Sequence, residues 1–185
     1  MNHLATSKED ILAASRDLIK ENGWAAVSIR AVASRCSVSA GTIYNYYESK
    51  ADLLSDTIES IWHEIFFHPE AEQVFHDVES CISWIYERLE YGNSQFPGFF
   101  SLHSFGFMRD EKTSGKKKMM QTWGHIINGL CDVLKNDSKI RPNVFDQQFT
   151  EKQFADILFS LMLVSMIRQD YDPSSVLMLV KKTLY

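Results

Sequence analysis

The sequence predicts an all-α protein of about nine helices, because apolar residues recur at the spacing i, i+3, i+4 along most of its 185 residues. Prolines and glycines separate these periodic segments. No run of alternating apolar and polar residues is bounded by hairpin turns, which disfavours strands. Hydrophobic residues make up 45% of the chain, enough for a folded protein of one or two small domains. We expect a small helical domain over residues 1–48 and a larger one over residues 49–185.

The first predicted helix has two alternative caps at its start. Either Thr6 with Glu9 or Ser7 with Asp10 can form a capping box. Gly23 is expected to end the helix, because glycine adopts the left-handed conformation at little cost. The buried stripe consists of Ile11, Leu12, Ala14, Ser15, Leu18 and Ile19.

A short amphipathic helix is expected after Ser28. Ile29, Val32 and Ala33 have helical spacing, and Ser28 stands where an N-cap is expected, because its hydroxyl can accept from the first-turn amides. The pattern breaks at Cys36-Ser37-Val38, which predicts a tight turn.

A second short helix is expected after Ser39, with Ile43 and Tyr47 on its inner face. The other face has no acidic residue before Glu48. It consists of Ala40, Gly41, Thr42, Asn45 and Tyr46. Two short helices joined by a tight turn, the second with a polar and non-acidic face, predict a helix-turn-helix that binds DNA. The alternative is a chance pattern inside an ordinary helical domain.

Six longer helices are expected in the rest of the chain. Ser49 with Asp52 would cap the first of them, and Asp172 followed by Pro173 fits the start of the last. Their approximate ranges are 50–67, 70–91, 97–109, 113–136, 146–171 and 173–184.

In its first third the chain resembles the TetR (tetracycline repressor) family of bacterial transcriptional regulators. The resemblance is carried by Gly23-Trp24-Ala25-Ala26-Val27-Ser28-Ile29-Arg30, by Val32-Ala33, by Val38-Ser39-Ala40-Gly41-Thr42-Ile43-Tyr44-Asn45-Tyr46-Tyr47-Glu48-Ser49-Lys50 and by Leu53-Leu54. It implies an N-terminal DNA-binding domain followed by a helical domain for ligand binding and dimerisation. It also implies a ligand-responsive regulator, foremost a repressor that binds a palindromic operator as a dimer. A pure DNA-binding activator and a ligand-blind partner protein are the alternatives.

Two positions depart from the family pattern. Ser37 replaces the glycine usual in the turn, where a positive φ would strain a side chain. Tyr47 replaces the usual phenylalanine, so its hydroxyl would need a partner or solvent if the ring is buried.

The resemblance implies DNA contacts at ten positions. These are Ser28, Arg30, Ser39, Ala40, Gly41, Thr42, Tyr44, Asn45, Tyr46 and Lys50. The two serines, the two tyrosines and Lys50 would contact phosphates, and Arg30 a base or a phosphate. The three small residues after Ser39 and Asn45 would lie nearest the base edges. Without the family context, the serines would be plain helix caps and Lys50 a solvated charge.

The charge distribution is unusual for a DNA-binding protein, which is expected to carry a basic surface. Residues 1–54 contain six Lys or Arg and six Asp or Glu, and the whole chain carries −5. Residues 28–50 hold three basic residues and one acidic residue, a local charge of +2. We therefore expect modest non-specific affinity and tight binding only to an operator.

The larger domain has a different composition. All twelve phenylalanines lie after residue 65, and such side chains suit an adaptable apolar interior. The resemblance implies an inducer site there for an apolar or aromatic effector of unknown identity. Candidate lining residues are Trp62, Phe66, Trp84, Phe99, Phe100, His103, Phe107, Met119, Met120, Trp123, Ile127 and Met162. The alternative for each is ordinary core.

A homodimer through the last two helices, at about 146–184, is a further expectation. Residues 154–168 are apolar nearly all round, so that helix needs cover beyond its own domain. In the resembled family the last two helices pair with their two-fold mates. The apolar residues of the last helix are Val176, Leu177, Met178, Leu179, Val180 and Leu184. The alternative is that both helices are the core of a monomer.

Other functions are disfavoured. His63-Glu64 followed by His68 has the spacing HExxxH, which differs from the HExxH of zinc helices. No other motif for catalysis, metal or cofactor binding is present, so we expect neither an enzyme nor a cofactor. Three widely spaced cysteines predict no disulfide framework. No signal peptide or membrane span is recognisable, so a cytoplasmic protein is expected.

Overall fold

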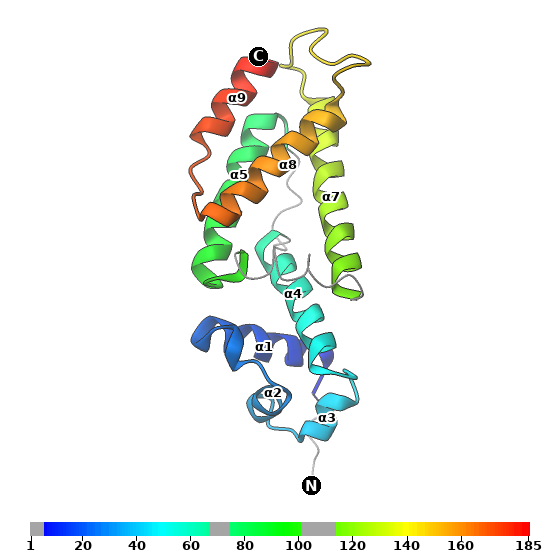
Figure 1. The fold of residues 1–185 in the computed structure, drawn as a ribbon, viewed down its shortest axis with the longest axis vertical. Helices are drawn as coiled ribbons and strands as arrows, with labels where there is room; N and C mark the ends of the chain where they lie inside the picture. The colour runs from blue at the N-terminus through cyan, green and yellow to red at the C-terminus, as the bar shows by residue number, and fades with distance from the viewer. Residues whose placement is uncertain (1–5, 67–74, 101–113) are drawn as a thin grey trace. The chain divides into compact units, whose positions relative to one another are not determined.

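The computed structural model describes residues 6–66, 75–100 and 114–185, with the backbone alone described at 114–119 and 122 (Figure 1). In this part of the chain there are eight α-helices, one short 3-10 helix (Trp24–Ala26) and no strand. The predicted all-α class is therefore confirmed. The helix expected at 97–109 lies mostly outside the described residues. The α-helices are α1 (Lys8–Asn22), α2 (Ile29–Arg35), α3 (Ala40–Tyr44), α4 (Lys50–Phe66), α5 (Val78–Gln95), α7 (Ser114–Asn136), α8 (Glu151–Arg168) and α9 (Ser174–Leu184).

Residue packing divides the chain into two compact units. The described part of the first unit contains residues 6–66 and 94–98. That of the second contains residues 75–93, 99–100 and 114–185. Helix α4 thus packs within the first unit. The functional boundary expected after residue 48 stays a prediction.

The start and end of α1 follow from local hydrogen bonds. The amide of Asp10 donates to Ser7 Oγ over 3.1 Å, and the amide of Ser7 donates to Asp10 Oδ2 over 2.8 Å. This is the capping box of Ser7 with Asp10, one of the two predicted alternatives. Gly23 has a φ of 75° and its amide donates to the carbonyl of Ile19, so the chain leaves the helix where expected.

Helix α4 packs against α1 through apolar residues and ion pairs. Its buried side chains include Leu53, Ile58, Ile61 and Ile65. Lys8 Nζ lies 2.6 Å from Asp56 Oδ2, which links the beginning of α1 to α4. The predicted cap is present, because the amide of Asp52 donates to Ser49 Oγ over 3.2 Å.

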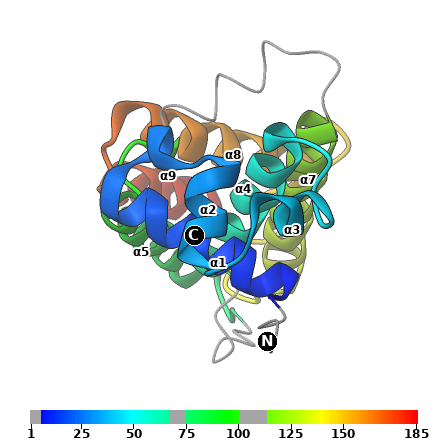
Figure 2. The same cartoon turned by 90° about the horizontal axis from the view of Figure 1, so that it is seen from below.

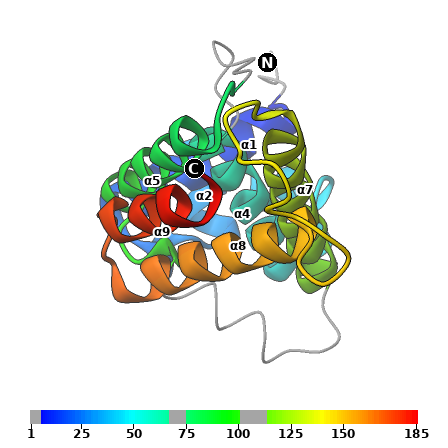
Figure 3. The same ribbon diagram turned by 90° about the horizontal axis from the view of Figure 1, so that it is seen from above.

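The second unit is a helical bundle in which α7 packs along α8 (Figure 3). Its core contains apolar residues from α5, α7, α8 and α9. Tyr86 of α5 and Ser165 of α8 are joined by a hydrogen bond of 3.1 Å between their hydroxyl oxygens. Buried residues include Ile82, Leu89, Leu130, Leu134, Phe154, Leu158, Met162, Met166, Val176, Val180 and Leu184.

Helix α5 begins at Val78 rather than near residue 70, because Asp77 caps it. The amide of Ser80 donates to Asp77 Oδ1 over 2.8 Å. The helix runs to Gln95, beyond the predicted end at 91, and stops before Pro97.

Helix α8 occupies residues 151–168 rather than 146–171. Asp146 Oδ1 accepts from the amides of Gln148 and Phe149, which forms a turn before the helix. Thr150 then caps the first turn with Gln153. At the other end, Gln169 adopts a left-handed conformation with φ 53°. The start of α9 agrees with its predicted cap to within one residue, since the amide of Ser174 donates to Asp172 Oδ1.

Candidate nucleic-acid interface

Helix α3 is oriented by two buried side chains. Ile43 is fully buried and Tyr47 is 3% exposed. Tyr47 lies beyond the last residue of α3, but its amide still donates to the carbonyl of Ile43, so the helical turn continues. Helix α3 lies next to α2 (Figure 2). The face of α3 opposite the two buried side chains is open to solvent, with Tyr44 55% and Tyr46 43% exposed. The first unit therefore exposes the face that the sequence predicts to contact DNA.

Both predicted serine caps are present. Ser28 Oγ accepts from the amide of Ala31, and Ser39 Oγ accepts from the amide of Thr42, each over 3.1 Å. The hydroxyls of Ser39 and Thr42 also lie 3.0 Å apart in a hydrogen bond. These bonds fix where α2 and α3 begin. The two serines therefore have a structural role whether or not they also contact a phosphate.

The turn between α2 and α3 depends on a left-handed residue. Ser37 has a φ of 56°, as expected from its position in the turn. Its amide donates to the carbonyl of Ser34, and the amide of Val38 donates to the carbonyl of Ala33 over 2.9 Å. The turn thus satisfies backbone groups at the end of α2 and directs the chain into α3.

The two exposed tyrosines have different surroundings. The Tyr46 hydroxyl donates to the carbonyl of Thr6 over 2.5 Å. A tyrosine has one hydroxyl proton, so in this arrangement it is already used. Tyr46 therefore holds the residue before the α1 cap against the end of α3. The sequence offers no signal for this contact, because the two residues are 40 positions apart.

Gly41 is exposed on α3, and the local packing would accept a larger residue at this position. A Cβ placed there would meet only Ser39 Oγ at 3.5 Å, which is an ordinary contact. The absence of a side chain at Gly41 would allow a bound partner to approach the helix backbone closely. Ala40, Thr42 and Asn45 lie beside it, with Asn45 exposed.

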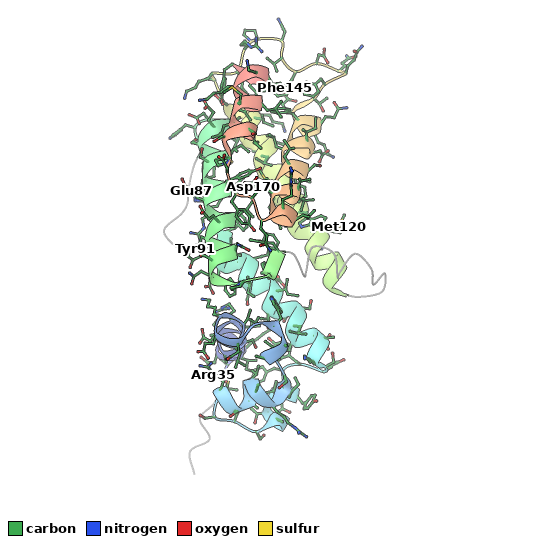
Figure 4. The ribbon with its side chains drawn as sticks, turned by 60° about the vertical axis from the view of Figure 1, so that its left-hand side comes forward. Arg35, Glu87, Tyr91, Met120, Phe145 and Asp170 are labelled. Carbon is green, nitrogen blue, oxygen red and sulfur yellow. The ribbon has the colours of Figure 1, made fainter. Side chains whose placement is uncertain are left out.

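Of the three basic residues between 28 and 50, one is paired within the unit. Both guanidinium Nη atoms of Arg35 donate to the carboxylate of Glu21, and this bond lowers the pKa of Glu21 (Figure 4). Arg30 and Lys50 are exposed. The positive charge at this surface therefore rests mainly on Arg30 and Lys50.

The structure gives no support for a metal or membrane site in the residues it describes. Glu64 of the HExxxH segment pairs with Arg16 and Lys20, and His68 lies outside the described residues. No group of three potential ligands from His, Cys, Asp and Glu is found in those residues. Burial raises the pKa of the Cys36 thiol. None of the described helices is long and apolar enough to span a membrane.

The sequence model described as "Bacterial regulatory proteins, tetR family" matches residues 11–57. This segment extends from α1 into α4 and contains the whole helix-turn-helix. Residues 11–57 form a TetR-type DNA-binding domain. The predicted resemblance is thereby confirmed, and the family is one of transcriptional regulators rather than enzymes.

A curated relative supports the same assignment for the TetR-type domain. The HTH-type transcriptional regulator UidR of Escherichia coli (strain K12) is 38% identical over 48 residues, which are 26% of this chain. The match spans only 24% of UidR. The likeness to UidR therefore concerns only about a quarter of each protein.

Solved structures extend the fold likeness to nearly the whole chain. The transcriptional regulator FadR from Bacillus subtilis, solved in complex with stearoyl-CoA, has a TM-score of 0.68 at 17% identity and covers 97% of this chain and 100% of that one. A transcriptional regulator from Rhodococcus sp. RHA1 has a TM-score of 0.64 at 18% identity, with coverages of 95% and 87%. At these identities the likeness shows a shared TetR-type fold alone.

The predicted effector-site residues are distributed over both units. Trp62 and Phe66 lie on α4, in the first unit, with ring centroids 5.6 Å apart. In the second unit, Trp84 contacts Phe75, and Trp123 contacts Phe159 at 5.5 Å between centroids.

The remaining effector-site candidates differ in exposure. Three of them are buried in the second unit, namely Phe99, Phe100 and Met162. Ile127 is half-buried and Met120 on α7 is exposed (Figure 4). His103, Phe107 and the side chain of Met119 lie outside the described residues. Whether any of these residues touches an effector stays a prediction.

Proposed function

We propose that this chain is a TetR-type, ligand-responsive repressor that binds a near-palindromic operator as a dimer and is released by a small-molecule effector. The observation that carries the proposal is the exposed, non-acidic face of α3. This face is fixed from behind by Ile43 and Tyr47 and at its start by the Ser39 cap. A short helix held in this way after a tight turn suits insertion into the major groove.

The residues of the face suggest how DNA would be read. Tyr44 and Lys50 are exposed and would contact phosphates, which position the protein. Asn45 is exposed and can form two hydrogen bonds with an adenine, and the Thr42 methyl group can contact a thymine. Arg30 on α2 adds charge near the same face. Tyr46 would use its ring or its oxygen lone pairs, because its proton is donated to Thr6.

Dimerisation is proposed through α8 and α9. Apolar side chains remain exposed on both helices, which is typical of a surface that another chain covers. They are Ile157, Val164, Ile167, Met178 and Leu179. The three on α8 recur at intervals of seven and three, so they share one face. Val176, Val180 and Leu184 are buried inside the unit, so the interface is proposed at the exposed residues and not at these three.

The effector is proposed to bind in the second unit, which is rich in aromatic residues. Trp123 Nε1 and the Tyr171 hydroxyl are buried and have no hydrogen-bond partner in the described part of the chain, so they are available to polar atoms of a ligand. Fatty acyl-CoA is one class to test first, since the B. subtilis FadR structure contains stearoyl-CoA. Any effector must bind the DNA-free form more tightly than the DNA-bound form. A cytoplasmic location is part of this proposal.

Selection of bound duplexes from random DNA tests the proposal. We expect a near-palindromic consensus and tight binding by the wild-type chain. Tyr44→Ala should weaken binding about tenfold or more, as expected when a well-placed DNA contact is lost, without loss of stability. Lys135→Ala, at an exposed position on α7, is the matched control and should bind normally. A failure to enrich any sequence would contradict the proposal. Compounds are then screened for release of the selected duplex, and failure of every tested class would remove only those classes.

A further inference from the structure

Phe96 is a fully buried aromatic residue that follows the last residue of α5. It is 0% exposed and lies in the segment 94–98, which packs in the first unit. The residues on both sides, 75–93 and 99–100, pack in the second unit. Helix α5 ends at Gln95, so its last two residues and Phe96 already belong to the first unit.

Inside the first unit, Phe96 meets an ionic cluster that joins α1 to α4. Lys20 Nζ lies 4.9 Å from the centroid of the Phe96 ring, within cation–π distance. The same ammonium is 2.6 Å from Glu64 Oε1. Glu64 Oε2 is in turn 3.0 Å from Arg16 Nε. These three charged side chains are part-buried, so solvent screens their attraction less than at an open surface.

The segment that connects Phe96 to the second unit is short and conformationally restricted. Only Pro97 and Gly98 separate Phe96 from Phe99. Proline restricts its own φ, and Gly98 adopts a φ of 78°, which a side chain would strain. Phe99 and Phe100 are then buried, with their ring centroids 5.2 Å apart. Two residues therefore separate the buried ring of Phe96, in the first unit, from the buried aromatic pair of the second unit.

We propose that Phe96 is a positioning residue for DNA binding, which sets the α1–α4 packing according to the state of the second unit. In contact with Lys20, the Phe96 ring keeps the ammonium close to Glu64 and thereby stabilises the packing of α4 against α1. Helix α4 begins at Lys50, directly after the segment that follows α3, so its placement fixes the reading helix. Withdrawal of Phe96 would loosen this packing and weaken operator binding. The inference rests on the proposed function and adds the device by which it is regulated.

Three variants of the full chain test this role. Phe96→Ala removes the ring, Phe96→Leu keeps an apolar side chain without an aromatic face, and Lys20→Met removes the ammonium. Leu89→Ala is the matched control, because Leu89 is equally buried on α5 but lies in the second unit. For each variant, affinity is measured on the duplex selected by the wild type, and amide hydrogen exchange is measured in α1, α4, α8 and α9.

We expect Phe96→Ala to weaken operator binding and to speed exchange in α1 and α4 by about tenfold each, since a coupling residue typically carries such an effect. Exchange in α8 and α9 should stay within about twofold of the wild type. In Leu89→Ala, amide exchange should be faster in α8 and α9 and close to that of the wild type in α1 and α4. Phe96→Leu and Lys20→Met should each weaken binding by about threefold, in line with an ordinary cation–π contact.

Unchanged affinity and unchanged exchange in α1 and α4 for Phe96→Ala would overturn the inference. If Phe96→Ala unfolds the whole chain, the two milder variants decide, and wild-type behaviour of both overturns it. The proposed function fails separately, if the wild type itself enriches no duplex.

Discussion

The hydroxyl of Tyr47 is buried and has no hydrogen-bond partner among the described residues, at a position where the TetR family usually has phenylalanine. The ring is 3% exposed, and the ammonium of Lys8 lies 5.6 Å from its centroid. Burial raises the pKa of this phenol well above its usual value, so the group stays neutral. An unpaired buried hydroxyl opposes folding, because it has lost its hydrogen bonds to water.

Tyr47→Phe should therefore raise the free energy of unfolding by about 1 kcal/mol, the usual cost of one unsatisfied polar group. Urea denaturation measures the change, and operator affinity should not move. Tyr86→Phe is the control, because that hydroxyl bonds to Ser165 and its loss should destabilise the second unit. A less stable Tyr47→Phe protein would show that the hydroxyl has a partner in solution.

The turn between α2 and α3 contains a residue in a strained conformation, which leads to a second prediction for single residues. Ser37 has a φ of 56°, which costs an ordinary residue about 1 kcal/mol relative to glycine. Ser37→Gly should be neutral or more stable, whereas Ser37→Val should lose more than about 1 kcal/mol, because a β-branched residue tolerates this region poorly. Thermal unfolding of both variants checks this order. Equal stability of the glycine and valine variants would contradict it.

What the sequence could predict for single residues depends on the range of their contacts. The caps Ser28 and Ser39 bond within three residues, so the sequence alone was sufficient to predict them, whereas for α1 it left Thr6 and Ser7 as alternatives. The contact of Tyr46 with Thr6 and the burial of Phe96 under Lys20 join distant positions. No local pattern encodes such contacts.

Among the helices, α5 shows most clearly how a cap determines a boundary. Asp77 accepts from the amide of Ser80 and from Lys139 Nζ at 2.7 Å. These bonds lower the pKa of the Asp77 carboxyl well below its usual range, with the Lys139 bond as the largest cause. The sequence missed this start because several positions near residue 70 also allow a helix, and the tertiary contact with Lys139 is not visible in it.

Asp77→Ala should lower the free energy of unfolding by about 1 kcal/mol at pH 7, the usual cost of a lost N-cap. The native carboxyl has a depressed pKa, so its stabilisation is present above the unfolded pKa of about 4 and declines as the pH falls below it. The difference between wild type and variant should therefore shrink between about pH 4 and pH 2. Urea midpoints across this range measure it. A difference that grows with acidity would contradict the assignment. Asp132→Ala, at an exposed site on α7, serves as the control.

For α8 and α9, the periodicity of apolar residues does not distinguish the buried face from the exposed one. Both are apolar on more than one face, so the sequence predicted an interface without identifying its residues. The structure separates the faces, because Val176 and Val180 are buried while Met178 and Leu179 are exposed. Only the packing of α9 within its unit reveals which side remains available to a partner.

At the scale of the whole molecule, the proposed dimerisation would compensate for the modest charge of the DNA-binding surface. Val164→Glu places a charge on the exposed apolar face of α8 and should leave the fold intact, because Val164 is exposed. We expect a monomer in sedimentation and an operator affinity lower by about 100-fold, the usual scale for losing bivalent binding. Lys152→Glu, exposed on the same helix, should stay dimeric. A Val164→Glu dimer of wild-type affinity would place the interface elsewhere.

The central claim is that the α3 surface reads one DNA sequence. It is tested most directly by the affinity of the wild-type chain for its selected operator and for a scrambled duplex, measured as salt is raised. Operator binding should be at least about 1,000-fold tighter than binding to the scrambled duplex at physiological salt, the lower end for specific DNA-binding proteins. Both affinities should fall as salt increases, because phosphate contacts release counterions. Equal affinity for the operator and the scrambled duplex would contradict the claim.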